Sequence, residues 1–135
     1  HAFEPWNAQN VYFYDADKNI VEFIARKNLK NNSHKSFDSN SILNISEIGL
    51  PTQDINIEYD LLKTISNIEI YDGSTKRFCA IGDEEGMFIV INKLLKKQWF
   101  PTEDKPFSSP FIIEFQEKGK DFKFAYRNEI LKQIV

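Results

Sequence analysis

The most informative chemical group in the sequence is the carboxylate of Glu22, which lies inside a run of apolar, strand-forming residues. Alternation along a β-strand places Ile20, Glu22 and Ile24 on one face and three further apolar side chains on the other. Because both faces are apolar, we expect the strand to be covered on both sides. A carboxylate there is costly unless it is paired, protonated or bound to a metal. Glu22 is therefore either a metal ligand or an acid at a sheet edge, solvated or paired with a Lys.

Length and composition exclude several classes of protein. The 135 residues suffice for one domain or two small modules with a shared core, and 41% hydrophobic residues argue against disorder. The net charge of −3, with acids and bases interspersed, leaves no basic stripe for nucleic acid. No apolar run approaches the roughly 20 residues of a membrane span. The lone Cys79 rules out an internal disulfide and fits a reducing compartment, so we expect a cytoplasmic protein.

The element that carries Glu22 is predicted to be a β-hairpin. Residues 11–15 and 20–25 are aromatic or β-branched runs, joined by an Asp- and Asn-rich turn. The composition then shifts to Asn, Lys, Ser and Asp between residues 27 and 41, which indicates a linker.

Residues 41–92 are predicted to run β-α-β-β-β. A strand over 41–50 should end at Pro51. A helix capped by Asp54 should carry Ile57, Leu61 and Ile65 on one apolar face, with Leu62 beside them. A strand over 67–71 and a hairpin of 77–81 with 87–91 follow. Beyond an irregular segment over 96–110, we expect a hairpin of 111–115 with 122–126 and a terminal helical turn over 129–135.

Two of the predicted hairpins can be superimposed in sequence. Residues 15–24 and 83–92 both follow a strand, carry acids at the first and third turn positions, and then become apolar. If the second unit begins near Ile42, the first would begin upstream of His1. The chain would then contain only the last part of its first unit.

The segment Val-Tyr-Phe-Tyr-Asp-Ala-Asp-Lys-Asn-Ile-Val-Glu-Phe-Ile over residues 11–24 resembles the terminal hairpin of the vicinal-oxygen-chelate superfamily. This group includes glyoxalases, extradiol ring-cleavage dioxygenases and bleomycin-resistance proteins. Their hairpin reads aromatic-x-aromatic-x-Asp-Pro-Asp-Gly-Asn-x-x-Glu, from which this chain departs at Ala16 and Lys18. The Glu of that pattern binds a divalent metal in the family, and it falls on Glu22.

The resemblance covers roughly residues 1 to 93 and implies an α+β fold of βαβββ modules with a curved, mainly antiparallel sheet. On this basis, residues 1–29 are the C-terminal hairpin of a first, truncated module, and 30–40 are a linker. Residues 41–93 are a second module, and 94–135 are a C-terminal extension with a β-hairpin and a terminal helical turn.

A second match concerns Glu47. Residues 47–52, Glu-Ile-Gly-Leu-Pro-Thr, resemble the first strand of a module, where the family has a metal-binding His in place of Glu47. A carboxylate can bind the same divalent ions, so the resemblance makes Glu47 a second candidate metal ligand. Val90 stands where the second hairpin would carry its Glu, and Val cannot be a ligand. The family builds one site from two modules. The resemblance therefore implies that Glu22 pairs with residues upstream of this chain to hold Fe, Mn, Ni or Zn, and that this fragment alone holds none.

The remaining candidates are aromatic and histidine side chains. Trp6, Tyr12 and Tyr14 either line a cup for a ligand or fill a core. His1 and His34 are expected to be solvated bystanders at the terminus and in the linker. Cys79 is expected to be a small core residue.

Three functions follow. The first is a metal-dependent lyase or dioxygenase of the vicinal-oxygen-chelate type, acting on a small oxygenated molecule. The second is a non-catalytic module that binds a small molecule, as resistance proteins of this group do. The third is a dimerising half of a larger protein. The expected partners are a small-molecule ligand and either a second copy or a missing N-terminal module, with neither nucleic acid nor membrane.

Overall fold

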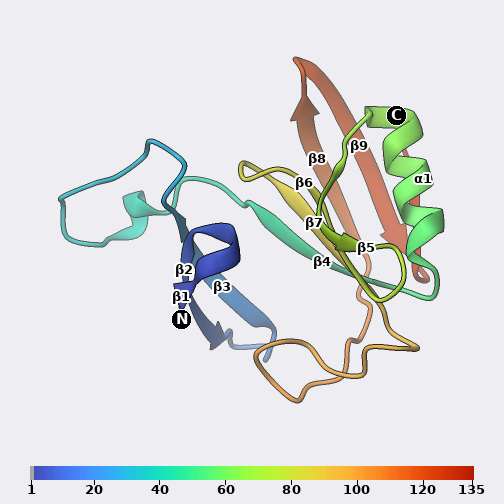
Figure 1. Ribbon diagram of the computed structural model, residues 1–135, viewed down its shortest axis with the longest axis horizontal. Coiled ribbons are helices and arrows are strands. Elements are labelled where there is room, and N and C mark those ends of the chain that lie inside the picture. Colours follow the sequence, from blue (N-terminus) through green and yellow to red (C-terminus); the bar gives the residue numbers. More distant parts are fainter. Residues whose placement is uncertain (1) are drawn as a thin grey trace. The chain divides into compact units, whose positions relative to one another are not determined.

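The computed structural model describes residues 2–135 and divides the chain into two compact units (Figure 1). The N-terminal unit is His1–Asn44 and the C-terminal unit is Ile45–Val135. The described residues form one α-helix and three mainly antiparallel sheets, which confirms the predicted α+β class. Within them, no helix combines the length and the apolar character needed to cross a membrane.

The N-terminal unit is a three-stranded antiparallel sheet with the order β1-β2-β3. Its elements are β1 (Ala2–Phe3), a 3-10 helix (Glu4–Trp6), β2 (Ala8–Tyr14) and β3 (Ile20–Arg26), followed by irregular chain and a short 3-10 helix (Ser39–Ser41). The predicted first hairpin is confirmed as β2 and β3. Its turn begins at Asp15, whose carboxylate accepts hydrogen bonds from the backbone N–H groups of Asp17 and Asn19.

The C-terminal unit begins with a four-stranded sheet and one helix. In chain order these are β4 (Glu47–Thr52), α1 (Ile55–Ser66), β5 (Ile70–Ser74), β6 (Phe78–Gly82) and β7 (Met87–Asn92). The predicted β-α-β-β-β order is therefore confirmed. The sheet order is β4-β7-β6-β5, in which β4 pairs with β7 in parallel and the other neighbours are antiparallel.

Two strand boundaries differ from the prediction. The first strand covers Glu47–Thr52 rather than 41–50, and Pro51 lies within it instead of ending it. The reason is that β4 is an edge strand with a single neighbour, where a missing N–H can face away from the sheet. Strand β5 begins at Ile70 and continues through Gly73, although Asp72 and Gly73 were expected to end it.

Helix α1 begins as predicted, with the Asp54 carboxylate accepting a hydrogen bond from the N–H of Asn56. Its buried face matches the predicted one in part, because Leu62 is fully buried and Leu61 and Ile65 are half-buried against the core. The buried residues are Ile55, Glu58, Leu62 and Ser66, whereas Ile57 is 62% exposed. The helix thus buries a carboxyl group on a face that a count of apolar residues does not select.

The third sheet has the antiparallel order β10-β9-β8, formed by β8 (Phe111–Glu117), β9 (Lys120–Arg127) and β10 (Ile130–Gln133). The predicted hairpin of β8 and β9 is confirmed, but the terminal helical turn is wrong, because β10 occupies that segment. Asn128 and Glu129 both have left-handed backbone conformations, with φ of 52° and 63°. Two such residues make a tight hairpin turn that returns the chain along β9.

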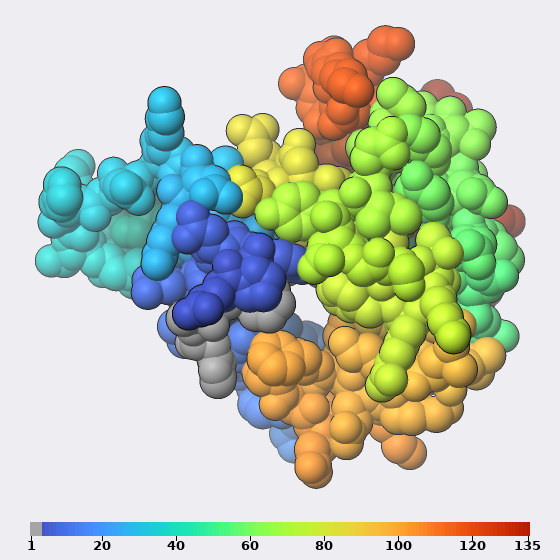
Figure 2. Space-filling view, viewed as in Figure 1, coloured from blue at the N-terminus to red at the C-terminus, as the bar shows by residue number. Residues whose placement is uncertain are grey.

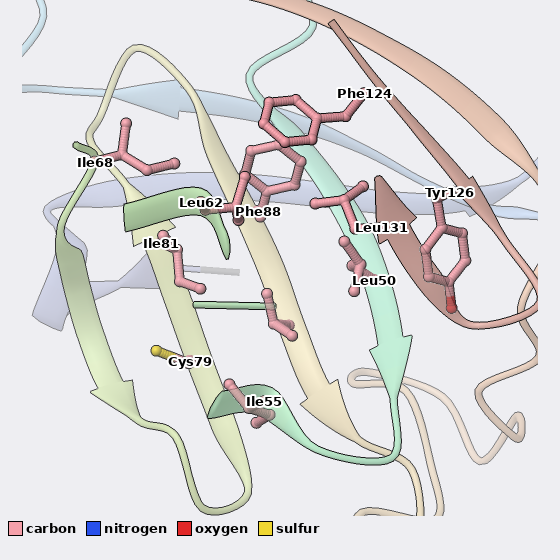
Figure 3. Packing of buried hydrophobic residues seen from close by; sticks show 11 residues of the cluster. Leu50, Ile55, Leu62, Ile68, Cys79, Ile81, Phe88, Phe124, Tyr126 and Leu131 are labelled. Carbon is pink, nitrogen blue, oxygen red and sulfur yellow. The ribbon is translucent and has the colours of Figure 1, made fainter. Parts of the chain in front are cut away.

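The core of the C-terminal unit lies between the four-stranded sheet, α1 and the third sheet (Figure 3). The segment expected as a C-terminal extension contributes Phe124, Tyr126 and Leu131 to this core. The Tyr126 hydroxyl also donates a hydrogen bond to the backbone carbonyl of Pro51. Residues 94–135 are therefore part of the same packed unit as the β-α-β-β-β segment.

Candidate functional site

The strand register of the N-terminal unit places Glu22 directly opposite Tyr12. Neighbouring pairs on the same face are Asn10 with Ile24 and Ala8 with Arg26, so the predicted alternation of Ile20, Glu22 and Ile24 is confirmed. We call this side of the hairpin the Glu22 face. It brings together an acid, an amide, a phenol and a guanidinium.

The other side of this hairpin is apolar and open to solvent. Val11 is 63% exposed, Phe13 40% and Phe23 37%. The expectation that the strand is covered on both sides is therefore wrong. The rings of Phe13 and Phe23 meet at 5.0 Å between centroids, and Phe37 packs on Phe23 at 5.5 Å. The better-buried side is the polar one, where Asn10 is 6% exposed and Arg26 is 4% exposed.

Glu22 is half-buried and receives a hydrogen bond through its Oε1 from the side-chain Nδ2 of Asn10. The same Nδ2 lies 3.2 Å from the hydroxyl oxygen of Tyr12. Across residues 2–135, no Lys or Arg forms an ion pair with Glu22. Of the alternatives that the sequence left open, a Lys-paired edge acid is therefore not observed, and an amide holds the carboxylate instead.

The three aromatic candidates for a ligand cup lie in two places. Tyr12 is half-buried and Tyr14 is 52% exposed, and alternation puts both on the Glu22 face. Trp6 is buried at the end of the first 3-10 helix, and its ring centroid lies 5.6 Å from the guanidinium carbon of Arg26.

Asn10 and Arg26 were missed by the sequence reasoning. The signal was present, because Asn10 precedes Tyr12 by two positions and Arg26 follows Glu22 by four, so alternation places them on one face.

Glu47 lies at the start of β4, half-buried, in the C-terminal unit. Leu50 of β4 points into the core, so alternation places Glu47 and Gly49 on the opposite side of the sheet. There the ring of Trp99 covers Gly49 so closely that an added Cβ would lie 3.0 Å from a ring carbon. A Cβ at position 49 would therefore require the Trp99 ring to shift by a few tenths of an ångström.

The second hairpin carries no acid at the position that matches Glu22. Val90 is fully buried in the core. The turn before β7 spans 83–86 and is one residue shorter than the turn before β3, which spans 15–19. Counted from the start of each strand, Ile89 is therefore the third residue of β7, as Glu22 is the third residue of β3. A one-residue shift exchanges the two faces of a strand. Both alternatives are apolar, so neither supplies a ligand.

Within residues 2–135, no group of three or more His, Cys, Asp or Glu side chains is arranged to hold a metal. Glu22 and Glu47 belong to different units. His34 is exposed between the strands and the second 3-10 helix, and His1 lies outside the described residues.

Cys79 is a core residue, as predicted. Its side chain is fully buried, and this desolvation, together with the charge of Asp72, raises the pKa of the Cys79 thiol to about 11. A thiol of this kind stays protonated at neutral pH and is a poor nucleophile.

A further polar cluster surrounds Glu129 in the turn between β9 and β10. Its carboxylate accepts hydrogen bonds from Gln53 Nε2 at 3.0 Å and Ser108 Oγ at 3.1 Å, and it pairs with Lys93. An open cavity of about 720 Å³ lies beside this turn, lined in part by Ser108 and Glu129. Because internal partners already satisfy the carboxylate, its role is to fix the turn.

No family model matches the chain, and no curated protein does either.

Proposed function

We propose that this chain is part of a vicinal-oxygen-chelate-type protein that binds a small oxygenated molecule, with Glu22 as one ligand of a divalent metal. The observation that carries the proposal is the setting of Glu22. It is a half-buried carboxylate, two residues into a strand that follows an Asp-led turn, and it shares its face with Asn10 and Tyr12.

The surroundings of Glu22 suit a metal ligand. Asn10 donates to Oε1 and thereby orients the carboxylate, as outer hydrogen-bond partners do in metal sites. The other oxygen, Oε2, accepts no hydrogen bond from residues 2–135 and is available to an ion. Fe²⁺, Mn²⁺, Ni²⁺ and Zn²⁺ all accept carboxylate oxygen. When bound, such an ion supplies Lewis-acid stabilisation of charge that develops on a chelated oxygen.

The C-terminal unit supports the same assignment through its β-α-β-β-β order, which is the element order of a glyoxalase-like module. Glu47 replaces the family's His, and no acid replaces the family's Glu in β7. In this proposal the C-terminal unit is a structural copy of the module. The remaining ligands, and the half that faces the Glu22 side, come from an upstream module or from a second copy of the chain.

A second candidate function is binding without catalysis, as in resistance proteins of this group. Tyr12 and Tyr14 share the Glu22 face, and Arg26 stacks near Trp6. Aromatic walls with a few polar groups bind small molecules without a metal. In this alternative Asn10 and Glu22 orient the ligand by hydrogen bonds.

The deciding experiment uses the longer protein that carries the expected upstream module. Glu22→Gln keeps the size of the side chain but removes the ligating charge. We expect it to lower the affinity for Mn²⁺ or Zn²⁺ about 100-fold or more, because even outer partners of metal ligands are worth 10–100-fold. Glu4→Gln, a change at an exposed acid of the same unit, is the matched control and should leave metal binding unchanged.

Metal content after dialysis and a titration of affinity provide the measurement, with circular dichroism to confirm the fold. Equal affinity in wild type and Glu22→Gln would refute the metal-site proposal. A longer protein that holds no metal, but whose Trp6 fluorescence responds to a small oxygenated ligand, would favour the binding module.

A further inference from the structure

The side chain of Lys96 lies between two aromatic rings in the C-terminal unit. Its Nζ is 5.1 Å from the ring centroid of Phe78 and 6.0 Å from that of Trp99. Both distances are in the range of cation–π attraction. The segment that holds Lys96 and Trp99 reaches the surface of this unit, in the orange part of Figure 2.

Backbone hydrogen bonds hold the segment that carries Trp99 in place. The Trp99 N–H donates to the carbonyl of Asp104 at 2.8 Å, and the Thr102 N–H donates to the carbonyl of Trp99 at 2.8 Å. The Trp99 ring is seated against Gly49 on β4. The wall of the site is therefore preorganised, which lowers the entropy that a ligand must overcome.

A separate pair of backbone hydrogen bonds links the backbone of Arg77 to that of Lys96 through Asn92. The Lys96 N–H donates to the carbonyl of Asn92 at 2.8 Å, and the Asn92 N–H donates to the carbonyl of Arg77 at 3.0 Å. Residues at the start of β6, at the end of β7 and in the turn after it thus meet. Desolvation and the nearby Arg77 charge both lower the pKa of the Lys96 amine.

The two cations lack an acidic partner. In the part of the chain that the structure describes, neither Lys96 nor Arg77 forms an ion pair, whereas Lys63, Lys93 and Lys123 each pair with a Glu. The Arg77 charge acts on the half-buried Lys96 amine, and such an interaction between like charges is unfavourable. An anion that touches both would relieve this cost.

We propose that Lys96 and Arg77, together with the rings of Phe78 and Trp99, form a binding site for a small carboxylate that carries a flat apolar group. The ammonium and the guanidinium would hold the carboxylate through charge-assisted hydrogen bonds. The half-buried rings supply apolar and π surface for the rest of the ligand. This surface favours an organic anion over inorganic phosphate. The site is independent of Glu22 and of any metal, so the two proposals fail separately.

Benzoate is the probe, added to the 135-residue chain and followed by the amide and indole N–H resonances of the protein. We expect saturable shifts at the Lys96 amide and the Trp99 indole N–H. Benzyl alcohol, which has the same ring without charge, should bind about tenfold more weakly or worse, because hydrogen bonds to charged groups are the stronger ones. Inorganic phosphate should also bind more weakly than benzoate.

Two pairs of variants locate the site. Lys96→Met should weaken benzoate binding about tenfold or more, whereas Lys97→Met, a change at the next and exposed lysine, should leave it within about twofold. Arg77→Met should weaken it as well, with Lys76→Met as its exposed control. Lys96→Arg keeps the charge and should retain binding, which also serves if Lys96→Met fails to fold.

Three results would each overturn the proposal. The first is equal loss of benzoate binding in Lys96→Met and Lys97→Met. The second is benzyl alcohol or phosphate binding as tightly as benzoate. The third is a benzoate titration that shifts neither the Lys96 nor the Trp99 resonance.

Discussion

In the hairpins β2–β3 and β6–β7, the same kind of turn joins the two strands, but the strands carry different side chains. Asp15 accepts hydrogen bonds from two backbone N–H groups of its turn, and Asp83 does the same with the N–H groups of Glu85 and Gly86. Past the turn, β3 carries Glu22, whereas β7 is apolar from Met87 to Ile91.

The difference follows from where each hairpin stands in its sheet. Strands β6 and β7 lie inside the four-stranded sheet, and Cys79, Ile81 and Val90 are fully buried there. An acid at any of these three positions would be buried among apolar side chains, which is costly. On the N-terminal hairpin a polar neighbour is available, because Asn10 donates a hydrogen bond to Glu22. Between these two hairpins, apolar packing therefore prevails in β6–β7, and a polar side-chain pair is present only in β2–β3.

The largest expected effect tests this contrast directly. Phe124→Ala removes a fully buried ring from the core, and it should lower the free energy of unfolding of the C-terminal unit by about 3–5 kcal/mol. Phe23→Ala removes a ring that is 37% exposed on the N-terminal hairpin and should cost less, about 1 kcal/mol. Amide hydrogen exchange measures each unit separately. A loss at Phe23 as large as that at Phe124 would show that the exposed face supports the fold.

The next effect in size concerns the turn at Glu129. Glu129→Ala loses the hydrogen bonds from Gln53 and Ser108 and the pair with Lys93, so we expect a loss of about 1–3 kcal/mol. Glu129→Gly loses the same contacts but suits the φ of 63° without strain. The Gly variant should therefore be more stable than the Ala variant by about 1 kcal/mol. Urea unfolding measures both, and an Ala variant as stable as the Gly variant would contradict the strain argument.

Local patterns predicted most of the elements. Alternation in residues 11–25 predicted the first hairpin and the side on which Glu22 lies, and Asp54 marked the start of α1. Each of these depends only on neighbours within a few positions, which is the range over which sequence periodicity is informative.

The rest depends on contacts between distant segments. Pro51 is allowed in β4 only because that strand is at a sheet edge. The pair Asn128 and Glu129 lacks the glycine that usually marks a two-residue turn, so the strand after it was predicted as helix. Lys96 acquires its setting from Phe78 and Trp99, which strand pairing and a later loop bring to it.

The smallest expected effect on stability comes from Glu58. It tests what a polar group costs when it is buried in the C-terminal unit. Its carboxyl group is buried, accepts a hydrogen bond from Thr52 Oγ1 at 3.2 Å, and leaves Oε2 without a partner among the described residues. Desolvation raises the pKa of Glu58, and the negative charge of Asp54 raises it further. Hydrogen bonds from the Thr52 side chain and the Leu131 backbone lower this pKa, but the net shift is upward. The ionised form is therefore less stable in the folded protein than in the unfolded chain.

This raised pKa determines the sign of the pH dependence. The stabilising contribution is fully present below the ordinary Glu value of 4.5 and is lost as the pH rises through the higher folded pKa. Glu58→Gln cannot ionise, so we expect wild type to lose stability relative to it as the pH rises above 4.5. Asp60→Asn, on the exposed side of α1, controls for the change in net charge. The measurement is urea unfolding across this pH range. A stability difference between wild type and Glu58→Gln that stays constant, or moves in favour of wild type as the pH rises, would show that the buried carboxyl is better solvated than its packing indicates.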